Sequence, residues 1–173
     1  MTATPVDILG LIAARHARRP AQALPELDQL FKRLAACAPG EAAATEDRIW
    51  DAWMHHPNRD AAEVLQRATR DIAARRYDIA ETRLGALLRS APAFAEAWHK
   101  RAALYYLQGR DEEFLHDIRR TLELEPRHFC AMLHFGEILF AGGAPEEGRF
   151  AFRAVLSLHP NLPRARQGLS DNP

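Results

Sequence analysis

The chain has 173 residues, of which 47% are hydrophobic and 27% are charged, as in an ordinary globular protein with one good-sized core. Lys plus Arg and Asp plus Glu both number 23, so the net charge gives no electrostatic reason to expect nucleic acid or an anionic membrane as a partner. Cys37 and Cys130 form neither a CxxC pair nor a secreted disulfide framework. We therefore expect reduced thiols and a cytoplasmic protein.

Residues 1–24 are predicted to form an N-terminal arm or a short amphipathic helix. Their apolar run, 6–14, is followed by Arg15, Arg18 and Arg19, which is the wrong order of charges for a secretory signal. The run is also far too short to span a bilayer. The three arginines are the densest basic cluster in the chain, and we expect them to form a solvated face, not a nucleic-acid site.

Residues 25–60 are predicted to form a helical hairpin that has no repeat pattern. Its two helices are expected over 25–37 and 41–56, where apolar residues recur at helical spacing. We expect the hairpin to cap the N-terminal end of the structure that follows. In that position Trp50 and Trp53 would cover the first helix of the first repeat.

The rest of the chain repeats itself every 34 residues. Pro92, Pro126 and Pro160 are 34 residues apart, and each ends an apolar helical stretch that proline cannot continue. Each unit opens with a helix, breaks near its fifteenth position and resumes with a second helix. The three units are residues 61–94, 95–128 and 129–162. Residues 163–173 remain as a short C-terminal cap and tail.

The pattern within the units resembles the tetratricopeptide repeat, W-x2-L-G-x2-Y, then A-x3-F, then P. The middle unit reads Trp98-x2-Arg101-Ala102-x2-Tyr105, then Phe114-x3-Ile118, then Pro126. The resemblance covers 102 of the 173 residues and extends to small proteobacterial tetratricopeptide-repeat (TPR) proteins of unassigned function. It implies an all-α fold, a right-handed α-solenoid of three TPR helix hairpins with an N-terminal helical cap.

Small residues and charges mark particular positions of the repeats. A small residue recurs at Ala68, Ala102 and Gly136, where the two helices of a unit approach closely. Charges depart from the pattern, with Arg101 in a leucine position and Asp71 in a tyrosine position. Two interpretations stay open: solvated charges at the edge of the packing, or a salt bridge between Asp71 and Arg101 of neighbouring units.

The first helix of each unit presents a second face, which in a curved stack lines the concave wall. In proteins with this repeat, the wall commonly holds an extended peptide or a partner helix, so we expect a scaffold or adaptor that binds another protein. We expect neither nucleic acid nor membrane as a partner. The predicted partner-binding groove consists of Leu65, Gln66, Thr69, Glu96, His99, Lys100, Ala103, Tyr106, Leu133, His134, Glu137 and Phe140.

Motifs for catalysis are missing from the sequence. It has no phosphate-binding glycine loop, no GxSxG and no HExxH, so we expect no enzyme and no cofactor. One alternative remains, a metal or enzymatic site in the groove. Cys130, His134 and Glu137 share a helical face, and Glu96 and His99 occupy equivalent places one unit earlier.

The C-terminal end suggests a second surface. Only about two helical turns remain after the third unit to cover its last helix, and exposed apolar area favours association. We therefore expect weak self-association through this end. The apolar residues in question are Phe150, Phe152, Val155, Leu156 and Leu158.

Overall fold

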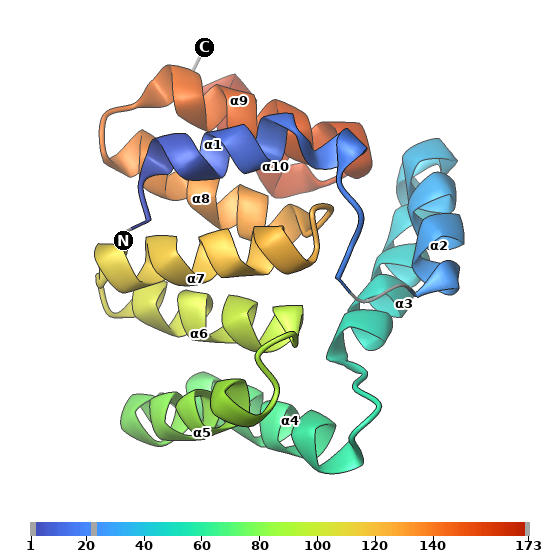
Figure 1. Ribbon diagram of the computed structural model, residues 1–173. Helices are drawn as coiled ribbons and strands as arrows, with labels where there is room; N and C mark the ends of the chain where they lie inside the picture. Colours follow the sequence, from blue (N-terminus) through green and yellow to red (C-terminus); the bar gives the residue numbers. More distant parts are fainter. Residues whose placement is uncertain (1–2, 22–23, 172–173) are drawn as a thin grey trace.

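The computed structural model describes residues 3–21 and 24–171, with the backbone alone at Pro39, and is helical throughout these ranges (Figure 1). Within them the chain forms ten α-helices and two short 3-10 turns, and no strand. The helices are α1 (Pro5–Ala13), α2 (Pro25–Ala36), α3 (Ala42–Met54), α4 (Arg59–Ala73), α5 (Tyr77–Ser90), α6 (Ala95–Leu107), α7 (Asp111–Leu124), α8 (Phe129–Ala141), α9 (Pro145–Leu158) and α10 (Pro163–Asp171). The 3-10 turns are η1 (Arg15–Ala17) and η2 (Pro39–Glu41).

The three predicted units appear as the helix pairs α4 and α5, α6 and α7, and α8 and α9, stacked one above another (Figure 1). Ala68 and Ala102 are fully buried, and a Cβ at Gly136 would lie 2.6 Å from the Phe152 ring, which shows how closely the paired helices approach. The break between α6 and α7 contains Gly109 in the left-handed region, at φ 69°. The predicted all-α repeat architecture is confirmed.

The N-terminal segment forms a docked helix. A capping box begins α1, because Thr4 accepts a hydrogen bond from the backbone of Asp7 while the Asp7 carboxylate accepts one from the backbone of Thr4. Ile8 and Ile12 lie one turn apart and are fully buried. They pack α1 against α7 and α9, the second helices of units two and three.

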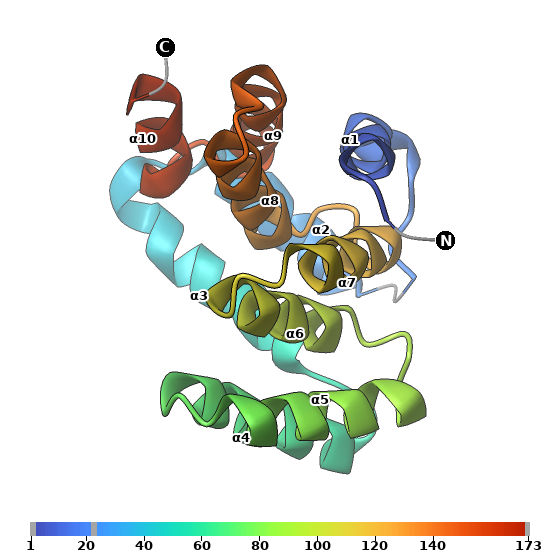
Figure 2. The ribbon, with the colours of Figure 1, turned by 90° about the vertical axis from the view of Figure 1, so that its left-hand side faces the viewer.

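The predicted position of the N-terminal hairpin is wrong in one respect. We expected Trp50 and Trp53 to cover the first helix of unit one. Instead α3 runs beside the first helices of the stack (Figure 2). The two rings contact His128 and Phe129 at the start of α8. A hydrogen bond between two loops also ties the hairpin to the stack, since the Asn161 side chain donates to the Cys37 carbonyl at 2.9 Å.

The two charged residues that depart from the repeat pattern, Arg101 and Asp71, each pair with residues of their own unit and not with a neighbouring unit. Arg101 donates twice to Asp117 of its own unit, at 2.6 and 3.0 Å. Asp71 accepts two hydrogen bonds from Arg76 and forms an ion pair with Arg83 at 2.8 Å. The proposed Asp71–Arg101 salt bridge is therefore wrong. Each charge has a partner on, or next to, the second helix of its own unit, which is nearer than the neighbouring unit.

The C-terminal helix of unit three is better covered than we expected. Phe152, Val155 and Leu158 are all buried, because α1 packs on one side of α9 and α10 on the other. Leu156 is partly buried, and Phe150 stays exposed at 39%. The premise of a large uncovered apolar end is therefore wrong, and self-association stays a prediction with Phe150 as its main support.

Candidate partner-binding site

The predicted groove residues lie on the first helices of the three units, but the structure divides them into a covered and an open set. Leu65, Glu96, His99 and Leu133 are no more than 2% exposed. The open set keeps part of its surface accessible. It consists of Gln66, Thr69, Ala103, Tyr106, His134, Glu137 and Phe140, with Lys100 at the boundary. We call these seven residues the open groove.

Side chains of α3 cover the boundary of the groove. The indole of Trp53 stacks on the His128 ring, with centroids 4.1 Å apart and planes within 8°. The neighbouring Trp50 lies 6.0 Å from the His99 ring and 4.7 Å beneath the Lys100 ammonium. The protein's own hairpin therefore occupies the end of the wall near the starts of α6 and α8, where the sequence had suggested a site for a partner.

Beneath the two tryptophans lies a buried polar network centred on Glu96. His128 is the N-cap residue of α8, and its Nδ1 accepts from the backbone N–H of Ala131 at 3.2 Å. Its other nitrogen, Nε2, therefore carries the ring proton and donates to Glu96 Oε2 at 2.8 Å. On the other carboxylate oxygen, Lys100 Nζ lies at 2.9 Å and His99 Nδ1 at 3.5 Å. The network thus joins the start of α6 to the start of α8.

Burial sets the protonation of these groups. Burial alone would raise the pKa of Glu96, but His99, Lys100 and the His128 N–H hold that pKa well below its ordinary value. Burial lowers the pKa of His99 to about 4 and that of His134 to about 3. Near neutral pH Glu96 is therefore a carboxylate, and His99 and His134 are neutral imidazoles.

A metal ion fits this network poorly. Ligand atoms of Glu96, His99 and His128 all lie within 4.8 Å of one another, so the distances alone would allow a site. Both nitrogens of His128 are nevertheless engaged in hydrogen bonds, and the Lys100 ammonium already compensates the carboxylate. In the described part of the chain, the other predicted ligands, Cys130, His134 and Glu137, do not join this group.

Nucleophilic chemistry at Cys130 is also disfavoured. Burial raises the pKa of the Cys130 thiol, and Glu96 raises it further, so the reactive thiolate is scarce at neutral pH. The Cys130 thiol is free, as is that of Cys37. The geometry of the buried polar network around Glu96 thus supports a structural role for that network.

The open groove retains an aromatic centre with polar groups beside it. Tyr106, 38% exposed, stacks on the His134 ring, with centroids 5.8 Å apart and planes within 16°. Glu137 accepts a hydrogen bond from Arg164 of α10 at 2.6 Å, and its other oxygen is buried without a hydrogen-bond partner, as is Nδ1 of His134. An accessible tyrosine with polar side chains beside it is typical of a recognition surface.

Sequence reasoning missed His128 and misplaced Trp50 and Trp53. His128 closes unit two just before the apolar run of α8, which is an N-cap position and a usable signal. The tryptophans are three residues apart on α3, so one helical face carries both rings. Nothing in that spacing says which unit the face contacts.

No protein-family model matches the chain. It is 29% identical over 135 residues to a TPR repeat-containing protein of Rhizobium etli, an alignment that covers 78% of this chain and 66% of that protein. The chain thus spans about two thirds of that relative's length. A solved structure of a MamA mutant superposes with a TM-score of 0.54 at 16% identity, covering 84% of this chain and 82% of the other.

The fold, the 34-residue register and this relative together show a helical-repeat architecture similar to that of tetratricopeptide-repeat proteins. They support a role in protein–protein interaction in general terms. In the described residues, no helix is both long enough and apolar enough to cross a membrane.

Proposed function

We propose that this chain is a protein–protein interaction module that binds a segment of another protein on the open groove. The observation that carries the proposal is the Tyr106–His134 stack, an aromatic surface that stays accessible in the open groove, while the part of the face near the starts of α6 and α8 is covered. Tyrosine gives a large contact area for a small loss of rotamer entropy, which is why it is frequent in binding surfaces.

Because α3 covers part of the groove wall, fewer kinds of partner can bind there. A long peptide running the whole length of the stack would meet Trp50 and Trp53, so we expect a short segment or one face of a helix. Glu137 lies in the open groove and is already paired with Arg164, so this end of the surface offers both signs of charge to a partner. We further propose a reducing compartment such as the cytoplasm, where Cys37 and Cys130 stay free.

The test blocks the open groove without removing any of its contacts. Ala103 lies in the groove next to the stack, so Ala103→Arg should fill it and abolish capture of the partner in cross-linking experiments in the native host. Ala86→Arg is the matched control, since Ala86 is exposed on α5, a second helix. Circular dichroism of both variants checks that the fold is kept. Partner capture that survives Ala103→Arg, or is lost equally with Ala86→Arg, contradicts the proposal.

The alternative, a metal or enzymatic site in the groove, rests only on the grouping of Glu96, His99 and His128. Metal analysis of the purified protein tests it. One equivalent of zinc that is lost with His99→Gln would favour the alternative.

A further inference from the structure

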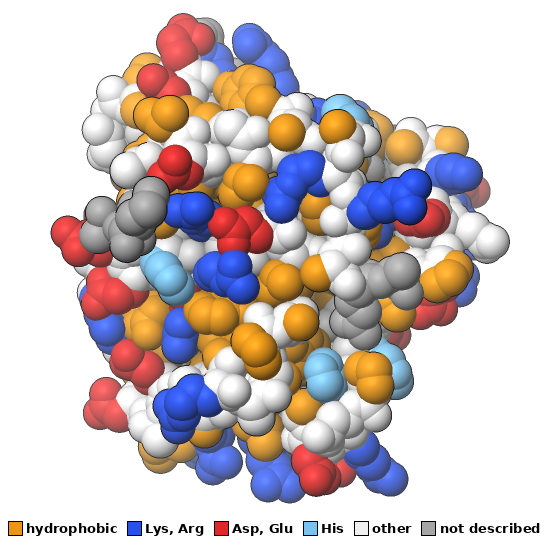
Figure 3. Space-filling model, in the orientation of Figure 1, with side chains coloured by type: hydrophobic (Ala, Val, Ile, Leu, Met, Phe, Trp, Pro, Cys, Tyr) orange, Lys and Arg blue, Asp and Glu red, His pale blue; other side chains and the backbone are white. Residues whose placement is uncertain are grey.

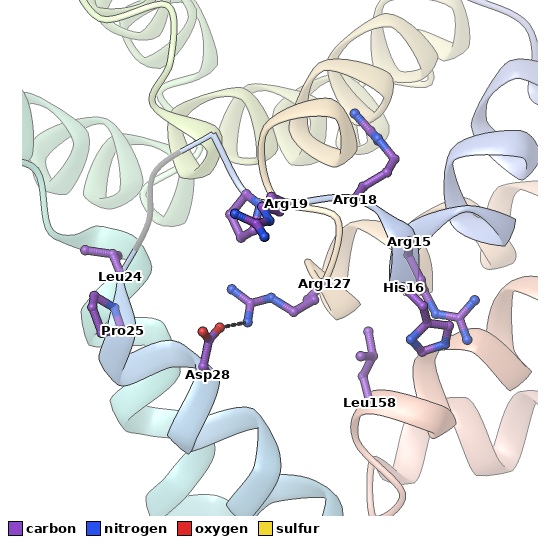
Figure 4. A pocket seen from close by; sticks show the side chains of 10 residues that line it. Arg15, His16, Arg18, Arg19, Leu24, Pro25, Asp28, Arg127 and Leu158 are labelled. Carbon is purple, nitrogen blue, oxygen red and sulfur yellow. Dashed lines mark hydrogen bonds and ion pairs between the residues drawn. The ribbon is translucent and has the colours of Figure 1, made fainter.

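A cavity of about 580 Å³ lies where the linker after α1 passes between α2 and the loop that joins α7 to α8 (Figure 4). Four arginines line it, Arg15, Arg18 and Arg19 from the linker and Arg127 from the loop, together with His16. Asp28 is the one acidic residue in the described lining. On the face shown in Figure 3, basic side chains surround the region between α1 and α2.

The positive charges in this cavity are only partly compensated by the protein. Arg127 is neutralised, since it pairs with Glu125 at 3.0 Å and with Asp28 at 2.6 Å. Arg18 donates to the carbonyls of Leu122 and Glu123, both at 3.0 Å, which orients the guanidinium but adds no negative charge. These two hydrogen bonds hold the Arg18 guanidinium against the end of α7.

The other two arginines have still less compensation. Arg15 donates to the Ile12 carbonyl and to the Ser157 hydroxyl, both neutral, while its Nε is buried without a hydrogen-bond partner. No ion pair or hydrogen bond joins Arg19 to another residue in the described ranges. Burial lowers the pKa of Arg15, as expected for a cation that has lost water and gained no anion.

From this geometry we propose that the cavity binds an acidic peptide segment, with Arg15 and Arg19 holding its carboxylates. Guanidinium groups match carboxylates in shape and charge, and the cavity already contains one such contact, in which the exposed Asp28 carboxylate meets Arg127 at 2.6 Å. Leu24 and Leu158 add apolar lining, which suits the methylene groups of glutamate side chains. The volume is typical of a site that encloses a few side chains.

This inference goes beyond the proposed function and does not depend on it, because none of the described residues that line the cavity belongs to the open groove. A partner could use both surfaces, but either can fail without the other. The basic linker, which the sequence had suggested to be a solvated face, is in this view a second binding surface.

The experiment titrates the full chain with fluorescently labelled hexaglutamate and follows anisotropy, with hexaglutamine as the neutral probe. We expect hexaglutamate to bind and hexaglutamine not to bind at an ionic strength on the order of 0.01 M, with binding weakening as salt is added. Arg19→Gln should weaken hexaglutamate binding about fivefold to tenfold, the loss of roughly one charge-assisted contact. Arg19 is exposed, so the fold should not change.

Arg70→Gln is the matched control, because Arg70 is an exposed arginine of α4 and no residue of α4 lines the cavity. It should leave the affinity unchanged. The proposal is overturned if hexaglutamate does not bind, or if both variants weaken binding equally. It is also overturned if inorganic phosphate binds in an Arg19-dependent manner while hexaglutamate does not, since the site would then take a small phosphate and not a peptide.

Discussion

Unit one and units two and three have the same helix–turn–helix plan but very different surroundings. Unit one packs its own small apolar cluster, which includes Leu65, Leu84 and Phe94 and reaches only the start of α6 and Met54 at the end of α3. Units two and three share a single larger core with α1, the α2–α3 hairpin and α10. In a repeat protein each unit gains stability from its neighbours, so extra elements on one end make the stack uneven. We expect unit one to open first.

The largest expected effect comes from the hairpin contact. Trp53→Ala removes the ring that stacks on His128 and contacts Phe129, and leaves a cavity in the larger core. We expect a loss of about 4 kcal/mol in the free energy of unfolding. Urea denaturation measures it. The matched control is Trp98→Ala, for which we expect about 2 kcal/mol, since Trp98 is partly exposed. Equal losses would mean that the hairpin is not integral to the larger core.

Acid should weaken the larger core more than unit one. His99 has a folded-state pKa of about 4 against an ordinary value of 6.5, so the unfolded chain binds a proton first as pH falls. The contribution of His99 to stability is therefore lost between about pH 6.5 and 4, and it amounts to on the order of 3 kcal/mol. In unit one, the Asp71 pKa is lowered by Arg76, so its contribution is lost only below the ordinary value of 3.8.

Urea denaturation at several pH values between these limits checks this expectation. In the His99→Gln variant the pH dependence should be shallower, while His16→Gln, at an exposed position, should leave it unchanged. A wild-type protein as stable at about pH 4.5 as at about pH 7 would contradict the burial of neutral His99.

Two glycine-to-alanine substitutions should change the stability of the protein in opposite directions in the two regions. Gly136→Ala in unit three places a Cβ 2.6 Å from the Phe152 ring, and we expect a loss of about 2 kcal/mol from the displaced packing. Gly85→Ala in unit one meets only the end of the Arg89 side chain, at 3.8 Å. There we expect a gain of about 1 kcal/mol from helix propensity. Melting curves of the two variants give the direction of each change in stability. A gain in stability in both variants would mean that α8 and α9 are less closely packed than described.

The smallest expected effect is local to unit one. Asp71→Asn weakens the contacts to Arg76 and Arg83, whose side chains are 55% and 41% exposed, so water can replace much of what is lost. Amide exchange in α4 and α5 should speed up while α8 and α9 stay unchanged. Asp117→Asn is the counterpart in unit two and should cost more, because Arg101 is only 17% exposed. Faster exchange throughout the chain with Asp71→Asn would show one cooperative unit.

The repeats could be predicted because their signals are local. Prolines that end helices, small residues such as Ala102 at close approaches, and a constant spacing of 34 residues all act within one unit or between adjacent units. The partners of Arg101 and Asp71 could not be predicted, and the salt bridge between them that was left open is absent, since a charge on a helix surface has several possible neighbours at similar distances. Only packing decides which one is nearest.

The sequence by itself determined the helices, their pairing into three units and the face that each first helix turns away from its partner, because hydrophobic periodicity and helix-stop residues fix these features locally. The tertiary structure alone decided that Trp50 and Trp53 cover part of that face and that Arg15 and Arg19 share a cavity with Arg127. Both arrangements join segments many residues apart through burial of surface, and no spacing along the chain specifies which distant surfaces meet.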